Sequence, residues 1–509
     1  MLFYRYLLIA FLLIHLAQSF AQTTEQTAVP TSFTPSGLGY AWDDFSPYQQ
    51  GLRDHLSPDE QQKIQALFNT QPIYHLDYQL DETLGHLSVK GDIRFTNLEE
   101  DALDSLYLQL LAVLFGAKLD LEDVVIYSSA EQSYQPQTEL QREGSLLKLD
   151  LAEALEPQES LVISLSYQLD LSQTTSEHYE LLNSDGRSLS LAHSFPQMAV
   201  FEKGWRLELP PNHGDLAYSE SSFFLVNIHH PQGLILASSG VNLETNSQET
   251  LIAAGPMRDF YLAASYDYGV LERKVNGLKL SSYYLPAQEQ AATWILDEAE
   301  KIMTLFDELY GAYPYREIDL LPIHMIALGV EFPGIVGILA NRYGAGALSI
   351  DQLNELSMVT AHELAHQWFY GLVGSNQVLE PWLDEGLTQY ATGRYFASVG
   401  PLASNTFHQG LLSRWRIISM KARAIDGKVE DYSDREYGAI IYGYAPLALE
   451  TLAEEVGQER FDDFLKDYSL KYRYELATAE DFFKLLEERC DCQVADRDES
   501  GQQRFGRLP

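Results

Sequence analysis

Residues 359–370, Val-Thr-Ala-His-Glu-Leu-Ala-His-Gln-Trp-Phe-Tyr, contain two histidines that are four positions apart. On a helix, His362 and His366 would lie on one face and one turn apart, which is close enough for both imidazoles to bind one metal ion. Glu363 follows the first histidine directly, the position of the general base in metallopeptidases that carry this motif. The stretch therefore predicts a catalytic metal site on a helix.

A third ligand is needed, because a catalytic zinc ion takes three protein ligands and a water molecule. Residues 381–388, Pro-Trp-Leu-Asp-Glu-Gly-Leu-Thr, supply Glu385, and eighteen residues separate it from His366. We therefore predict one Zn²⁺ ion as the cofactor, bound by His362, His366 and Glu385.

Two helices are expected to carry these ligands. The first is predicted over residues 351–370, with Asp351 as its N-cap and Gly371 as its stop. The second is predicted to begin at Pro381 and to run through Phe396, with Gly400 beyond its end.

The alternative to a metal site is a chance occurrence of the pattern on a surface helix. The first helix is apolar around the motif, so the ionisable side chains are expected to be partly buried. Buried ionisable groups need a partner, and a metal ion provides one for all of them. The apolar residues are Leu356, Met358, Val359, Leu364, Ala365, Trp368 and Phe369.

An all-β domain is predicted ahead of the motif, over residues 70–272. Alternating, β-branched and aromatic stretches there are typical of antiparallel strands, and Gly-containing turn signals separate them. The clearest strands are residues 73–80, 87–95, 161–167 and 222–228.

The hydrophobic period changes to that of helices after Gly277, which indicates a second domain over residues 273–495. One apolar strand, residues 318–327, interrupts the helical pattern. Besides the two ligand helices, helices are expected at residues 289–309, 444–455, 458–468 and 479–488. Residues 496–509 are predicted to be a polar tail.

The N-terminal residues 1–21 have the pattern of a secretory signal peptide: one basic residue, a short apolar run and Ser19-Phe-Ala21 as the cleavage site. We therefore expect export to an extracellular, periplasmic or cell-surface location. An uncleaved membrane anchor stays open as the alternative. Residues 22–69 are predicted to be a linker and N-terminal extension, because the first of them are rich in Thr, Ser, Pro and Gln.

Acidic residues outnumber basic ones by 73 to 34, and the formal net charge is −39. Such a surface repels phosphate backbones, so nucleic acid is not expected as a partner. The two cysteines, Cys490 and Cys492, are too few for a structural zinc site, and we expect either a peripheral disulfide between them or two free thiols.

The motifs together resemble those of the gluzincin metallopeptidases of the aminopeptidase N family. The resemblance rests on residues 362–368, on Trp382-Leu-Asp-Glu385-Gly and on the preceding all-β region. It implies a saddle-like antiparallel β domain followed by a thermolysin-like α+β, mainly helical, catalytic domain.

Two more site residues follow from the resemblance. Residues 329–334, Gly-Val-Glu-Phe-Pro-Gly, are similar to the family's Gly-x-Met-Glu-Asn segment and to its Gly-Met-Glu-Tyr-Pro variants. The resemblance implies that Glu331, with Gly329 at the same strand edge, binds the free amino group of a substrate. It also implies that Tyr442, in Ile441-Tyr-Gly-Tyr-Ala-Pro446, stabilises the tetrahedral intermediate, although Tyr444-Ala445 replace the family's Lys-Gly.

Many members of the family continue into a long helical domain that closes over the site. This sequence is similar to a short form without that domain, which implies a more open cleft or closure by another subunit.

We expect a zinc aminopeptidase that hydrolyses the N-terminal peptide bond of peptides with a free amino terminus. The alternatives are an endopeptidase or an epoxide-opening hydrolase on the same zinc site, neither of which needs Glu331 to meet an ammonium group. A non-catalytic peptide-binding protein is the third alternative, but such a protein has no use for Glu363. The sequence leaves the oligomeric state open.

Overall fold

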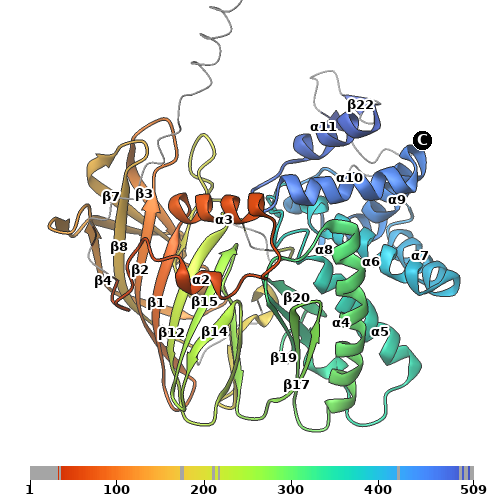
Figure 1. Cartoon of the computed structure of the whole chain (residues 1–509), viewed down its shortest axis with the longest axis horizontal. Helices are drawn as coiled ribbons and strands as arrows, with labels where there is room; N and C mark the ends of the chain where they lie inside the picture. The colour runs from red at the N-terminus through yellow and green to blue at the C-terminus, as the bar shows by residue number, and fades with distance from the viewer. Residues whose placement is uncertain are drawn as a thin grey trace, which may run out of the picture.

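A computed structural model of the chain describes residues 33, 36–171, 177–208, 213–215, 218–420, 425–491, 496–497 and 503–504. Figure 1 shows strands gathered on one side of the molecule and helices on the other. The predicted signal peptide, residues 1–21, lies outside the described residues. None of the helices within the described ranges combines the length and the apolar character needed to span a membrane.

The largest sheet of the β region has eight strands, in the order β14-β15-β12-β1-β2-β8-β4-β5. These strands are Val241–Thr245, Glu249–Met257, Ser222–His229, Ile73–Leu80, His86–Thr96, Ser160–Asp170, Lys118–Tyr127 and Ser133–Tyr134. The strands predicted at residues 73–80, 87–95, 161–167 and 222–228 are therefore confirmed. One pairing differs from the expected antiparallel pattern, because β1 and β12 run parallel. About 140 residues separate these two strands, so no hairpin forces them to be antiparallel.

Two four-stranded sheets complete the β region, in the orders β13-β16-β10-β9 and β11-β3-β7-β6. The strands of the first are Ile235–Ser238, Leu262–Ser265, Ser188–Leu191 and Leu182–Ser184. Those of the second are Gln197–Met198, Leu103–Gln109, Leu146–Leu155 and Gln137–Gln141. Alternate side chains of β2 are buried, which explains the alternating sequence from which these strands were predicted.

The second region begins with a mixed five-stranded sheet in the order β17-β18-β19-β21-β20. Its strands are Gly269–Val275, Leu278–Tyr284, Glu317–Ile323, Ile335–Leu339 and Gly329–Phe332. The strand predicted over residues 318–327 corresponds to β19, which ends at Ile323. Strand β20 lies at the edge of the sheet, and it carries Gly329 and Glu331.

Helices pack beside this sheet (Figure 1). They are α4 (Glu289–Tyr310), α5 (Ile350–Ala365), α6 (Glu385–Val399), α7 (Pro401–Arg416), α8 (Asp434–Ala439), α9 (Ala445–Val456), α10 (Gln458–Lys471) and α11 (Ala479–Cys490). A π-helical turn, Ile440–Tyr444, joins α8 to α9, and a 3₁₀ turn, Pro381–Leu383, precedes α6. Residues Asp496–Arg497 and Gln503–Arg504 in the predicted tail pair as two short strands, β22 and β23.

The ends of the ligand helices differ from the prediction. Helix α5 is capped by Ser349, not Asp351, because the Ser349 side chain accepts a hydrogen bond from the Gln352 backbone N–H in a capping box. It ends at Ala365, not Tyr370, because the chain turns back there and the Gly371 N–H donates to the carbonyl of His366. Helix α6 starts at Glu385 itself.

Part of the predicted linker is folded. Residues Ser46–Gln49 form α2 and Pro58–Thr70 form α3, whose N-cap is Ser57. Helix α3 is tied to the helical region by Glu60, which accepts hydrogen bonds from Arg473 and from the Tyr474 hydroxyl. Its largely polar sequence hides the short apolar stripe that it buries.

Cys490, at the end of α11, is disulfide-bonded, and Cys492 lies outside the described residues. This agrees with the first of the two states expected for the cysteines.

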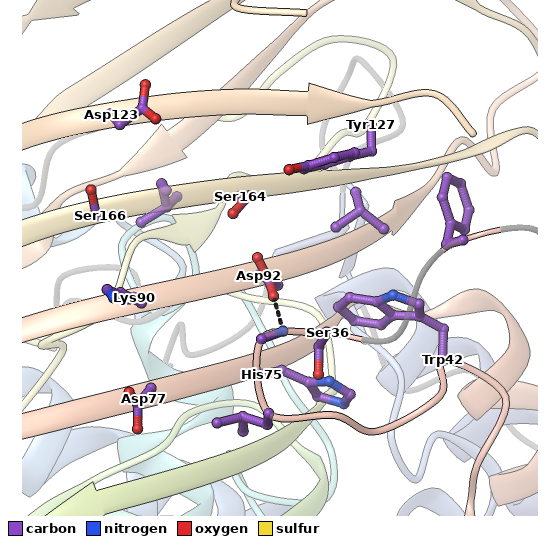
Figure 2. Close-up of a pocket in the computed structure, with 15 residues that line it drawn as sticks. Ser36, Trp42, His75, Asp77, Lys90, Asp92, Asp123, Tyr127, Ser164 and Ser166 are labelled. Atoms are coloured by element: carbon purple, nitrogen blue, oxygen red, sulfur yellow. Dashed lines mark hydrogen bonds between the residues drawn. The ribbon is translucent and has the colours of Figure 1, made fainter. Parts of the chain in front are cut away.

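A cavity opens on the eight-stranded sheet, away from the helical region (Figure 2). Trp42 and Tyr127 lie at one end of it, and Asp92 accepts a hydrogen bond from the Gly37 N–H at 2.7 Å. The ring of Trp42 stacks on that of His75 at a centroid distance of 4.5 Å. None of its lining residues comes from the helical region, so it is separate from the predicted metal site.

Candidate metal centre

The structure brings the three predicted zinc ligands together from two elements. His362 lies in the last turn of α5, His366 directly follows that helix, and Glu385 opens α6. The Nε2 atoms of the two imidazoles are 3.3 Å apart, and Glu385 Oε2 lies 3.1 Å from His362 Nε2 and 3.5 Å from His366 Nε2. Neighbouring ligands of a tetrahedral zinc ion with bonds of about 2.1 Å are roughly 3.4 Å apart. The spacing therefore fits one zinc ion.

Two carboxylate oxygens near the three predicted ligands lack hydrogen-bond partners. Glu385 Oε2 and Glu363 Oε2 are buried and have no hydrogen-bond partner among the described residues. Buried polar atoms are nearly always paired, so unpaired ones in a cluster need an explanation. A metal ion with its bound water supplies the missing partner for both carboxylates.

Asp384 orients the second histidine. The sequence does not indicate this role, because neighbours on a helix point apart and Asp384 directly precedes Glu385. Asp384 is the N-cap residue of α6 and precedes the helix itself. Its Oδ1 lies 2.7 Å from His366 Nδ1. Gln377 donates a hydrogen bond to the other carboxylate oxygen. Asp384 therefore fixes the ring and the tautomer that leaves Nε2 available for a metal.

Glu363 and Gly329 are in direct contact. A side chain built at Gly329 would overlap the Glu363 side chain, so the glycine leaves the space that the carboxylate occupies. The structure thus assigns Gly329 a packing role against the predicted general base. The prediction that it contacts substrate stays open.

Glu331 lies on the same strand and points to the metal centre. A carboxylate oxygen of Glu331 is within 4.8 Å of ligand atoms of both His366 and Asp384, and the residue is buried. It also lines a small cavity with residues of the β region, among them His178 and Asp215.

Tyr442 reaches the site from the π-helical turn. Its hydroxyl donates a hydrogen bond to Glu385 Oε1, and its ring lies 5.8 Å from that of His362. A π-helical turn widens a helix by one residue and is common at functional sites. Here it directs Tyr442 towards the metal ligands, whereas the neighbouring Tyr444 is buried against Trp415.

Asp215 is a further site residue that the sequence analysis did not identify. It was interpreted as part of a turn in the β domain, yet one of its oxygens lies within 4.8 Å of ligand atoms of Asp384 and Glu385. Its sequence context, His213-Gly-Asp215, contains only the signal of a turn. Only the packing of the two regions brings Asp215 to the metal centre.

The site holds an excess of negative charge. Burial and the nearby carboxylates raise the pKa of Asp215 and of Glu363 well above the usual range, with Glu331 the largest neighbouring contribution to both. Burial raises the pKa of Glu331 to about 8; His366 opposes this rise, and Asp384 and Glu385 add to it. For His366, Asp384 and the other carboxylates overcome the effect of burial and raise its pKa. Five carboxyl groups in one buried cluster favour the binding of cations.

The geometry defines a class, a metallopeptidase-type site with two histidines and one glutamate as ligands. Residues 294–498 match the model of the Peptidase family M1 domain. The observed order, a β region and then a helical catalytic region, agrees with the aminopeptidase N type of this family.

Curated relatives carry aminopeptidase names. Aminopeptidase M1-B of Oryza sativa subsp. japonica is 28% identical over 259 residues, which is 47% of this chain and 29% of the relative. Aminopeptidase M1 of Arabidopsis thaliana is 25% identical over 298 residues, 52% of this chain and 32% of the relative. Endoplasmic reticulum aminopeptidase 2 of Homo sapiens is 25% identical over 237 residues, 42% of this chain and 23% of the relative. The match spans a third or less of each relative's length.

Proposed function

We propose that this protein is a zinc-dependent aminopeptidase that removes the N-terminal residue of peptides. The observation that carries the proposal is the position of Glu331, a buried carboxylate beside the metal ligands. A buried carboxylate there is suited to bind the ammonium group of a substrate whose first peptide bond reaches the metal. An endopeptidase would have no use for this charge.

His362, His366 and Glu385 would hold the ion, and Asp384 would keep His366 in position. When bound, zinc lowers the pKa of a water molecule and polarises the scissile carbonyl group. Glu363 accepts the proton of the attacking water and passes it to the leaving amine. Burial and the neighbouring Glu331 raise the pKa of Glu363, which strengthens this carboxylate as a proton acceptor.

Tyr442 stabilises the oxyanion that forms on the carbonyl oxygen. Its hydroxyl donates to Glu385 in this structure, so it is already next to the metal ligands. Burial, with Glu385 nearby, raises its pKa, which keeps the phenol protonated and able to donate a hydrogen bond.

The test is the hydrolysis of a panel of aminoacyl chromogenic amides, each beside its N-acetylated counterpart, with purified protein. We expect cleavage of the free-amine substrates only, with loss of activity in Glu363→Gln and after chelation. Glu331→Gln should lower kcat/KM on the free amines by at least 10²-fold, because it removes the charge that pairs with the ammonium group. Equal cleavage of acetylated substrates would favour an endopeptidase.

We also propose that the protein is exported. The proposal rests on the signal-peptide pattern of residues 1–21. Cell fractionation with N-terminal sequencing tests it: a mature chain that starts at Gln22 supports cleavage after Ala21. An intact N-terminus in the membrane fraction supports the anchor, and an intact N-terminus in the cytosol would contradict export.

A further inference from the structure

A large apolar groove is lined by residues of α5, α6 and α7. These helices lie at the edge of the helical region (Figure 1). Its volume is about 800 Å³, and its apolar lining includes Ile350, Met358, Phe396, Val399, Leu402 and Phe407. Leu402 and Ile350 are 81% and 75% exposed. Such a contiguous apolar surface is typical of a binding site.

The groove is lined by the same two helices that carry His362 and Glu385. Met358 lines it one turn before His362 on α5, and Gln389 lines it one turn after Glu385 on α6. Side chains one turn apart lie on the same helix face, so these two faces continue from the ligands into the groove.

The direction in which a substrate would run follows from Glu331. Its small cavity is lined partly by the β region and shares no residue with the groove. A peptide whose ammonium group lies at Glu331 and whose first carbonyl lies at the metal must therefore leave the site along the groove. The groove would hold the residues after the scissile bond.

Arg414 stands at the inner end of this path. Its guanidinium lies 5.6 Å from the centre of the Tyr442 ring, and that ring lies 5.8 Å from the ring of His362. Among the described residues no carboxylate pairs with Arg414, although the chain contains 73 acidic residues and 34 basic ones. A half-buried guanidinium without a carboxylate partner is suited to bind one from a ligand.

We propose that Arg414 binds the C-terminal carboxylate of short peptides whose residues after the scissile bond are apolar and pack in the groove. The proposal rests on the proposed function and names its substrate class. The guanidinium is within roughly 11 Å of His362, and a peptide extends at most about 3.5 Å per residue. Peptides with one to three residues beyond the scissile bond therefore fit.

The test compares a peptide X-Leu-Phe that has a free carboxylate with its C-terminal amide, where X is the residue best cleaved as a chromogenic amide. The same two peptides with X-Ser-Ser measure the contribution of the groove. We expect the wild-type kcat/KM to favour the free acid over the amide by at least tenfold, and Leu-Phe over Ser-Ser by at least tenfold.

Arg414→Gln should reduce the acid-to-amide ratio to about one, and Arg414→Lys should retain part of it. Each variant is normalised to its rate on the chromogenic amide, which carries no carboxylate, so a general effect through Tyr442 cancels in the ratio. Arg416→Gln is the matched control, because Arg416 is exposed on the same helix and does not line the groove.

A wild-type ratio near one, or a ratio that survives in Arg414→Gln, would overturn the role of Arg414. Equal rates on Leu-Phe and Ser-Ser peptides would overturn the role of the groove. Failure of the proposed function itself would look different, since the chromogenic amides would then not be cleaved at all.

Discussion

At the scale of single residues, Gly329 is where strand β20 approaches the predicted general base most closely. A methyl group there would occupy the space of the Glu363 carboxylate. Because Glu363 is fixed on helix α5 and the strand is paired to β21, the carboxylate has to move. Small displacements of a catalytic group have large effects on rate.

We therefore expect Gly329→Ala to lower kcat/KM by about 10²-fold while the protein remains folded. Gly438→Ala on α8 is the control, since a side chain there meets no atom within 4 Å. Hydrolysis kinetics and thermal unfolding of both variants check this. Full activity in Gly329→Ala would show that the strand or the carboxylate yields without consequence.

Asp384 contacts the imidazole of His366, one of the predicted zinc ligands. Its loss should leave the three ligands in place but release the imidazole from its fixed orientation. We expect Asp384→Asn to weaken zinc binding by about 10–100-fold, as is usual when a carboxylate partner of a metal-binding histidine is removed.

Competition with a chelator of known affinity measures this effect. Asp462→Asn is the control, because Asp462 accepts from Arg394 in the same region and lies outside the carboxylate cluster. Equal zinc affinities of wild type and Asp384→Asn would contradict an orienting role.

The two histidines could be proposed from sequence because helical spacing places them on one face, and Glu363 and Glu385 follow from their positions relative to this pair. Asp384 and Asp215 could not. Asp384 depends on a break in helical geometry just before α6, and Asp215 depends on how a loop of the β region packs against the helical one. Neither position can be derived from the spacing of residues along the chain.

At the scale of elements, strongly periodic helices and strands were predicted within a few residues, as for α4 and β1. Elements set by tertiary contacts were missed. The π-helical turn at Ile440–Tyr444 gives no pattern in its sequence, and α3 is too polar to show its buried stripe. Helix α5 ended early because the turn at His366 and Gly371 is stabilised by local hydrogen bonds.

Strand β19 carries a buried carboxyl group that links stability to pH. Burial, and then the charge of Glu317, raise the pKa of Asp319 to about 8. The hydroxyl of Tyr283 donates a hydrogen bond to it at 3.1 Å. Between the unfolded pKa of about 4 and the folded pKa, the folded state binds the extra proton, so stability falls as pH rises.

Asp319→Asn mimics the neutral carboxyl group, so we expect it to flatten the stability curve between pH 5 and pH 8. One such proton changes the free energy of unfolding by up to ~1.4 kcal/mol per pH unit. The variant should exceed the wild type least near pH 5, and its advantage should grow up to pH 8. Urea unfolding at four pH values tests this, and parallel curves for the two proteins would rule out the role of Asp319.

At the scale of the whole molecule, the metal centre depends on the joining of two regions. The β region contributes Asp215 and part of the wall of the Glu331 cavity, and the helical region contributes the predicted ligands. Arg258, at the end of the β region, is buried at this junction. Its Nε donates to the Tyr370 carbonyl at 2.9 Å, and its Nη2 donates to the Leu372 and Glu475 carbonyls.

Arg258→Lys should therefore destabilise the protein by roughly 3 kcal/mol, because one ammonium group cannot satisfy carbonyls in three directions and buried acceptors are left unpaired. Two of these carbonyls, those of Tyr370 and Leu372, belong to the segment that follows the predicted zinc-binding histidines, so activity should fall at temperatures where the wild type is still fully active. Arg187→Lys is the control, since Arg187 pairs with Asp267 at the surface and such pairs contribute less than about 1 kcal/mol. Urea unfolding followed by both tryptophan fluorescence and residual peptidase activity separates the outcomes. If the two variants unfold at the same urea midpoint, the junction does not depend on Arg258. If only Arg258→Lys loses activity at urea concentrations below those that change its fluorescence, the catalytic site is disrupted before the rest of the fold, at the junction of the two regions.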